Sequence, residues 1–138
     1  MAQGLGIPQP KVAALAAVET VNLEMQATVD AALLTVMNKR GQIKDCLVDG
    51  PLAMDLALSS YAAEHKGIQS QVAGQADILL FHNIDAGNNV LKTLTIAGQC
   101  HFGGLVVGAK APVVLSSRGD SEENKLYSIA CAASVCGS

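Results

Sequence analysis

The residues of this chain best suited to chemistry lie in one short stretch, VVLSSRGDS (113–121). Apolar side chains end there in small hydroxyls and Arg118, as they do where a buried strand delivers polar groups to the rim of a pocket. An arginine guanidinium offers two parallel donors to phosphate or carboxylate oxygens, and serine hydroxyls and the free N–H groups of a following helix add neutral donors. The residue types therefore indicate an anion site. The alternative is an ordinary loop in which Ser121 only caps the next helix.

Polar residues also follow other predicted strands, where ligands of open α/β sheets bind. Asp49-Gly50-Pro51 comes after the second strand, and Asp49 either stabilises this turn or contacts a ligand. The pair Gly87-Asn88 allows a tight backbone, with the Asn88 amide bonded either to the backbone or to a ligand. Lys92, one helical turn further on, is either a solvated helix residue or a cation turned toward the strand ends.

Other classes of site are excluded by residue spacing. Gly4-Leu5-Gly6 precedes the first predicted strand, so it is no dinucleotide fingerprint, and the sequence contains no phosphate-binding P-loop pattern. The histidines lie far apart, and Cys46, Cys100, Cys131 and Cys136 form no C-x-x-C pair. No metal site is therefore predicted, and we expect the cysteines to be buried or half-buried free thiols.

Composition narrows the classes of partner. With 138 residues, 50% of them hydrophobic and 15% charged, the chain can bury the core of about one domain. A formal charge of −3, without basic clusters or aromatic platforms, argues against a nucleic-acid or anionic-membrane surface. No apolar run approaches the length of a membrane span and the first residues lack signal-peptide features, so we expect a cytoplasmic protein with free thiols.

The elements that must position these residues alternate along the chain. Strands are predicted over Lys11–Val18, Ile43–Val48, Ala76–Phe81, Gly103–Val107 and Val113–Leu115, and helices over Thr28–Arg40, Met54–His65, Val90–Gln99 and Glu122–Val135. This alternation predicts an α/β fold with a mostly parallel sheet flanked by helices. The last helix has Ser121 as its N-cap, acidic residues in its first turn, and an apolar stripe that we expect to be buried: Leu126, Ile129 and Ala133.

Four motifs, in this order, resemble those of the phosphate acetyl/butyryl transferase family, most closely its phosphate butyryltransferase branch. They are DGPL (49–52), GN-x-x-x-K (87–92), VGAKAP (107–112) and SR-x-DS (117–121). The resemblance covers almost the whole chain but only the C-terminal half of family members. It implies transfer of a short acyl group between coenzyme A and orthophosphate, with acyl-CoA and phosphate as substrates and no tightly bound cofactor.

The resemblance also implies a fold of two α/β lobes, that of the isocitrate/isopropylmalate dehydrogenase-like superfamily. Residues 1–110 would form the second lobe, which carries the cleft and the dimer contact. Residues 111–138 would be a C-terminal strand and helix returning to a first lobe that this sequence lacks. We therefore expect either a homodimer or a complementing N-terminal lobe. Residues 111–138 would otherwise add to the edge of the 1–110 sheet or swap into a neighbouring chain.

Site roles carry over by motif. Arg118 would hold the phosphate, and Ser117 would stabilise charge on the oxygen of the tetrahedral acyl carbon. Substrate-binding roles fall on the other motif residues: Asp49, Gly50, Pro51, Gly87, Asn88, Lys92, Asp120 and Ser121. Asn124 stands where the phosphotransacetylase branch has an acid, which leaves the general base unassigned, and His82-Asn83 replaces the usual Pro-Asp. The alternative to an acyltransferase is a non-catalytic binding or assembly module with the same fold.

Overall fold

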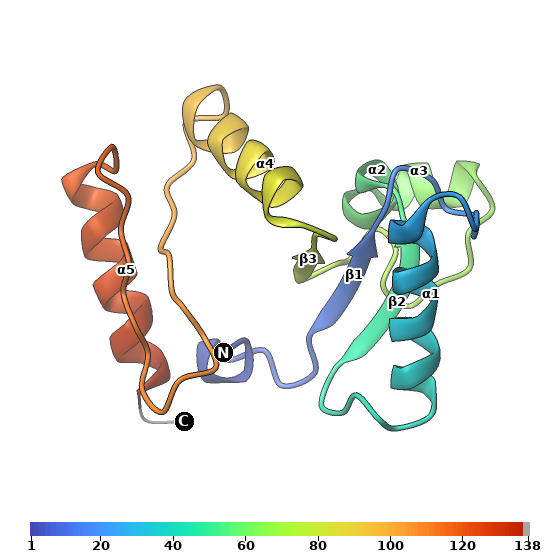
Figure 1. Ribbon diagram of the computed structural model, residues 1–138, viewed down its shortest axis with the longest axis horizontal. Coiled ribbons are helices and arrows are strands. Elements are labelled where there is room, and N and C mark those ends of the chain that lie inside the picture. The colour runs from blue at the N-terminus through green and yellow to red at the C-terminus, as the bar shows by residue number, and fades with distance from the viewer. Residues whose placement is uncertain (137–138) are drawn as a thin grey trace. The chain divides into compact units, whose positions relative to one another are not determined.

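The contacts of the chain divide it into two compact units. The structure, a computed structural model, describes residues 1–136 (Figure 1). The first unit, Pro8–Gly87, is called the sheet unit below, and the second combines Met1–Ile7 with the chain from Asn88 onward and is called the C-terminal unit. Among the described residues, no helix is long and apolar enough to cross a membrane.

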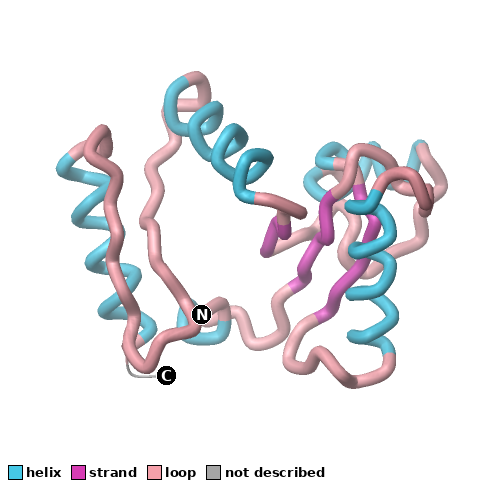
Figure 2. The backbone as a smooth tube through the Cα atoms, viewed as in Figure 1, coloured by secondary structure: helices cyan, strands magenta, loops and turns pink. Residues whose placement is uncertain are grey.

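The sheet unit is built on three parallel strands in the order β2-β1-β3 (Figure 2). They are β1 (Lys11–Leu15), β2 (Leu47–Leu52) and β3 (Ile78–Leu80). Val12 of the central strand pairs with Val48 on one side and Ile78 on the other. The predicted α/β class with a parallel sheet is confirmed, although β1 and β3 are shorter than predicted.

Helices cover both faces of this sheet. On one face, helix α1 (Gln26–Lys39) brings Ala31 against Ala14 and Gly50, where a Cβ at Gly50 would lie 2.6 Å from the Ala14 carbonyl oxygen. The close approach of α1 and β1 to β2 therefore requires glycine at position 50. On the other face, the core cluster gathers residues from β1, β2, the short helices α2 (Met54–Leu58) and α3 (Ser60–His65), and the loop after them: Ala13, Leu15, Leu52, Leu56, Ala57, Ala63, Val72 and Ala73.

Two predicted elements of the sheet unit are corrected. The single helix predicted over Met54–His65 is wrong, because Ser59 adopts extended backbone and its side chain accepts the Ala62 N–H as the N-cap of α3. The second strand begins at Leu47 instead of Ile43. In the loop before β2, the Asn38 side-chain amide donates hydrogen bonds to the carbonyls of Ile43 and Cys46, both at 3.0 Å. The pairing of β2 with β1 therefore starts only at Leu47.

Strand β2 both begins and ends later than predicted, so one candidate site lies inside the strand. Asp49, Gly50 and Pro51 were predicted as a loop after a strand, but they lie inside β2, and Asp49 is in register with Ala13. Pro51 is buried, and the Asp49 carboxylate accepts the Gly50 N–H at 3.0 Å.

Helix α4 (Ile84–Ile96) begins earlier than predicted. The Asn83 side chain accepts the Ala86 N–H at 2.9 Å, which caps the first turn six residues before the predicted start at Val90. Gly87 and Asn88 are therefore helical residues, contrary to their prediction as a loop.

The C-terminal unit contains the 3-10 helix η1 (Gln3–Leu5), most of α4, and helix α5 (Glu122–Val135). The bounds of α5 and its Ser121 N-cap are confirmed. The strands predicted over Gly103–Val107 and Val113–Leu115 are wrong, since within the described residues these segments share only an antiparallel bridge between Val106 and Val113. Side chains of α5 accept hydrogen bonds from backbone N–H groups in and just before the first segment instead.

The buried face of α5 is polar. Asn124 Oδ1 accepts the Phe102 N–H at 3.2 Å, Ser128 Oγ accepts the Gly104 N–H at 2.9 Å, and Ser128 is 2% exposed. The predicted burial of the apolar stripe is wrong as far as the chain's own sheet is concerned: Leu126 is 64% exposed, Ile129 is 58% exposed, and Ala133 is also exposed. The cysteines differ too, since Cys46 and Cys131 are half-buried as predicted but Cys100 and Cys136 are exposed.

Candidate functional site

The predicted catalytic pair lies on a turn closed by Asp120. The Ser117 N–H donates to Asp120 Oδ2 at 2.6 Å, and the Asp120 N–H donates back to the Ser117 carbonyl at 3.1 Å. Both backbone hydrogen-bonding groups of Ser117 therefore bond to one residue. Arg118 lies at the exposed tip of this turn and makes no ion pair among the described residues.

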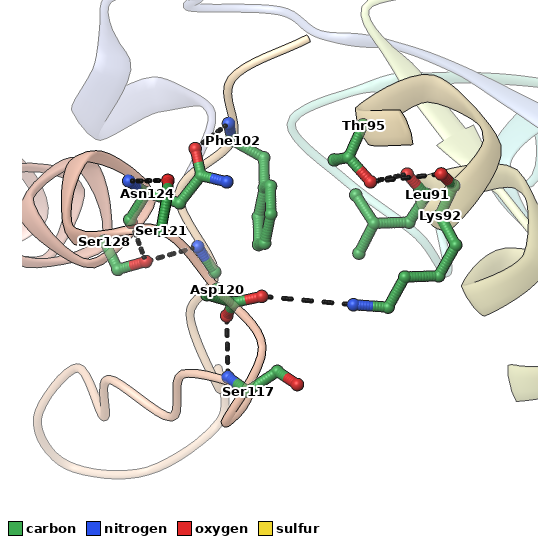
Figure 3. A network of polar contacts seen from close by, with 10 residues as sticks. Leu91, Lys92, Thr95, Phe102, Ser117, Asp120, Ser121, Asn124 and Ser128 are labelled. Carbon is green, nitrogen blue, oxygen red and sulfur yellow. Dashed lines mark hydrogen bonds and ion pairs between the residues drawn. The ribbon is translucent and has the colours of Figure 1, made fainter. Parts of the chain in front are cut away.

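Lys92 approaches the same carboxylate from helix α4 (Figure 3). Its Nζ lies 3.9 Å from Asp120 Oδ1, and the side chains of Lys92 and Asp120 are 44% and 7% exposed. The two oxygens of the Asp120 carboxylate thus contact different groups: Oδ2 accepts the Ser117 N–H, and Oδ1 faces the Lys92 ammonium. A pair at this distance in a partly solvated place is a weak to moderate attraction.

A pocket of about 390 Å³ opens beside this pair, within the C-terminal unit. Its lining joins α4, the loop that follows it and the start of α5: Lys92, Thr95, Ile96, Gln99, Cys100, His101, Phe102, Gly119, Asp120, Ser121 and Asn124. Ser121 Oγ accepts the Asn124 N–H at 3.2 Å, which caps α5 at the pocket wall. The pocket therefore combines an ammonium, a carboxylate, hydroxyls and amides, a set that can bind a polar ligand.

The residues predicted from the sequence fall into two groups. Lys92, Ser117, Asp120 and Ser121 meet around the turn and its pocket, and Arg118 projects from the same turn. Asp49, Gly50 and Pro51 belong to the sheet unit, in which Asp49 pairs with Ala13 and the register between β1 and β2 shifts beyond it. Gly87 is half-buried and Asn88 exposed on α4, and neither lines this pocket.

Some pocket residues were missed by reasoning from the sequence. Thr95 and Phe102 line the pocket, and so does Asn124, which was noted only as standing where the related branch has an acid and whose side-chain oxygen accepts the Phe102 N–H. The signal available was the four-residue spacing of Asn124 and Ser128, which places two polar side chains on one face of a helix. That spacing shows the polar face but not what packs against it.

A second, mostly apolar pocket of about 250 Å³ lies in the sheet unit at the carboxyl ends of β1 and β3. Its lining includes Leu15, Leu34, Phe81 and His82, the residue that directly follows the third predicted strand. The described residues hold no cluster of three histidine, cysteine or acidic side chains that could bind a metal ion.

One phenol beside the pocket carries a shifted pKa. The Tyr127 hydroxyl donates to Glu123 Oε1 at 3.1 Å, and this hydrogen bond together with the negative charge of Glu123 raises the pKa of Tyr127 above its ordinary value. His101 Nδ1 lies 3.4 Å from the other oxygen of the same carboxylate.

Comparison with known proteins identifies the family. A model of the family described as phosphate acetyl/butaryl transferase matches residues 1–133. The chain belongs to this family. Phosphate butyryltransferase of Clostridium acetobutylicum is 56% identical over 137 residues, which are 99% of this chain and 46% of that protein. Phosphate acetyltransferase of Thermotoga maritima is 50% identical over 133 residues, 96% of this chain and 45% of that protein.

A solved structure agrees with this phosphate acetyl/butaryl transferase assignment. The crystal structure of a branched-chain phosphotransacylase from Enterococcus faecalis V583 matches with a TM-score of 0.86 at 40% identity, covering 99% of this chain and 49% of that one. The family predicted from the four motifs is therefore confirmed. The chain spans about half the length of the relatives it matches.

Proposed function

We propose that this chain carries the catalytic turn of a phosphate acyltransferase that exchanges a short acyl group between coenzyme A and orthophosphate. The observation that carries the proposal is the Ser117-Arg118 turn, in which the backbone of Ser117 is held on both sides and Arg118 has no ion pair within the described residues. An unpaired, exposed guanidinium can bind a dianionic phosphate through two parallel hydrogen bonds.

The reaction transfers the acyl carbon from sulfur to oxygen. A phosphate oxygen attacks the thioester carbonyl carbon, a C–O bond forms and the C–S bond breaks, and the coenzyme A thiolate leaves and takes up the proton that hydrogen phosphate loses. Arg118 orients the phosphate for attack. The Ser117 hydroxyl donates to the carbonyl oxygen as negative charge develops on it. Acyl-CoA and phosphate are substrates in this scheme, so no tightly bound cofactor is needed.

The proposal also assigns the chain to parts of a two-lobed fold. Residues 1–110 correspond to the second lobe of an isocitrate/isopropylmalate dehydrogenase-like fold, and residues 111–138, which include helix α5, to a C-terminal segment that belongs with a first lobe. The coverage of about half of each relative supports this assignment. A complementing N-terminal lobe or a homodimer then supplies the remaining phosphate-binding groups. The cytoplasm is the compartment we propose, since it keeps the four free cysteines reduced.

The test is release of coenzyme A thiol from butyryl-CoA and phosphate, detected with a thiol reagent. The chain is assayed alone and together with a separately expressed N-terminal half of the Clostridium acetobutylicum relative. We expect thiol release that depends on phosphate, with Arg118→Ala as the inactive control. Absence of release in both arrangements would remove the enzyme and favour the non-catalytic module, for which the structural use of Asn124 is the supporting observation.

A further inference from the structure

The Asp120 carboxylate is in an unusual position for a residue beside an anion site. Its side chain is 7% exposed, and burying a carboxylate is costly unless its oxygens are paired. Oδ2 accepts the Ser117 N–H at 2.6 Å and Oδ1 faces Lys92 Nζ at 3.9 Å (Figure 3). The carboxylate thus accepts a hydrogen bond from the turn and forms an ion pair with Lys92.

Direct contact of Asp120 with a phosphate is unfavourable, because two anions repel each other most strongly where solvent is excluded. Its hydrogen bond to Ser117 is charge-assisted, and such bonds are stronger than those between neutral groups. Together with the bond from the Asp120 N–H to the Ser117 carbonyl, it closes a ring through four residues and restricts the backbone of Ser117 and Arg118.

We propose that Asp120 is a positioning residue for the Ser117-Arg118 turn, and that Lys92 acts through Asp120 by compensating its charge. This inference rests on the proposed function for its catalytic meaning, but its structural content can be measured without activity. It replaces the substrate-binding roles that the motif resemblance implied for Lys92 and Asp120. If the turn is already ordered before the substrate binds, less of the binding energy is lost to ordering the turn.

The first experiment reads the Ser117 amide by NMR in the ¹⁵N-labelled chain. A short hydrogen bond to a carboxylate moves this amide proton downfield and protects it from exchange. In Asp120→Ala we expect an upfield shift and exchange about tenfold to a hundredfold faster, as expected for loss of a charge-assisted bond. In Asp120→Asn, whose amide oxygen still accepts, both changes are smaller.

The matched control is Asp85→Asn, which removes an exposed carboxylate from the first turn of α4 and leaves the Ser117 amide unchanged. Amide signals of β1 and of α5 in each variant verify that both units are still folded. An unchanged Ser117 amide in a folded Asp120→Ala variant would overturn the proposal.

The second experiment separates the two roles of Lys92. In Lys92→Met the Ser117 amide moves in the same direction as in Asp120→Ala, but by less, whereas Lys125→Met on the exposed side of α5 changes nothing. Titration with inorganic phosphate follows in both variants. Weaker phosphate binding with an unmoved Ser117 amide would show that Lys92 binds the anion itself and would overturn its part of the proposal.

The activity assay adds a readout that a purely structural residue would not move. In the active arrangement, we expect Asp120→Ala to lower kcat about tenfold or more with a smaller change in the KM for acyl-CoA, and Asp120→Asn to recover part of it. Failure of the proposed function is distinguishable, because wild-type chain would then release no thiol while the Ser117 amide still reported on Asp120.

Discussion

Arg118 and Ser117 are adjacent in the sequence but differ in their bonding partners. The backbone of Ser117 is held by Asp120, whereas the Arg118 guanidinium is free of ion pairs within the described residues. A free, exposed guanidinium has lost none of its capacity to bind an anion. At the scale of single residues, the chain therefore presents a cation on a turn whose backbone is already ordered.

Arg118→Ala should weaken binding of inorganic phosphate or acyl phosphate about tenfold to a hundredfold, the equivalent of about 1.5–3 kcal/mol for a charge-assisted contact. Arg118→Lys should restore only part of it, because an ammonium lacks the bidentate fork. Calorimetric titration measures both. The control is Arg40→Ala, which removes the only other arginine, at the C-cap of α1. Equal affinity of the wild type and the Arg118→Ala variant would mean that the turn is structural.

Tyr127 should titrate above the ordinary tyrosine value of about 10, because its hydroxyl donates to the Glu123 carboxylate. A raised pKa favours the neutral phenol in the folded state. The contribution of this hydrogen bond to the stability of the folded state is therefore complete below the pKa that Tyr127 has in the unfolded chain. It is lost as the pH rises through the pKa of Tyr127 in the folded state. Phenolate absorbance in a Tyr61→Phe background follows the titration, and Glu123→Gln should return the pKa toward the ordinary value. An identical titration with and without Glu123 would contradict this.

At the scale of elements, two glycines show how packing decides what a position tolerates. Gly50→Ala should destabilise the chain by about 1–3 kcal/mol or more, as overpacking does, since its Cβ would meet the Ala14 carbonyl oxygen at 2.6 Å. Gly87→Ala on α4 meets only ordinary contacts with the Phe81 ring, at 3.5 Å and beyond. It should stabilise the helix by about 0.5–1 kcal/mol. Chemical denaturation of both variants compares them directly, and equal effects would contradict the close packing around Gly50.

Helix α5 yields a prediction that runs against its sequence pattern. Ile129→Asp should change the free energy of unfolding by less than about 1 kcal/mol, because the side chain is 58% exposed. Ser128→Ala should cost about 1–3 kcal/mol, since it leaves the half-buried Gly104 N–H without its acceptor. Thermal or chemical unfolding measures both. The reverse order, with Ile129→Asp the more damaging, would show that the apolar stripe is covered in solution.

At the scale of the whole molecule, stability should be distributed unevenly between the two units. Every buried apolar residue that the structure records lies between Pro10 and Ala73, whereas the buried residue of α5 is Ser128. Amides of β1 and β2 should therefore exchange with solvent only through global unfolding, and amides of the C-terminal unit should exchange faster through local opening. Hydrogen exchange followed by NMR tests this. Equal protection of α5 and β1 would contradict it.

The sequence alone determined the features that depend on near neighbours. Ser121 and the acidic residues after it define the start of α5, because an N-cap acts within one helical turn. The alternation of short apolar runs and amphipathic segments predicted a parallel α/β sheet. Four short motifs predicted the family, and the turn with Ser117 and Arg118 closes through residues three positions apart.

The tertiary structure alone decided the features that join distant residues. Asn38 displaces the start of β2 by occupying the carbonyls of Ile43 and Cys46, and the segment at Phe102 and Gly104 uses α5 side chains in place of a strand partner. The approach of Lys92 to Asp120 likewise depends on how α4 and the turn pack. Local patterns predict that a helix has two faces. Which face is covered depends on long-range hydrogen bonds and packing, which no short window of sequence contains.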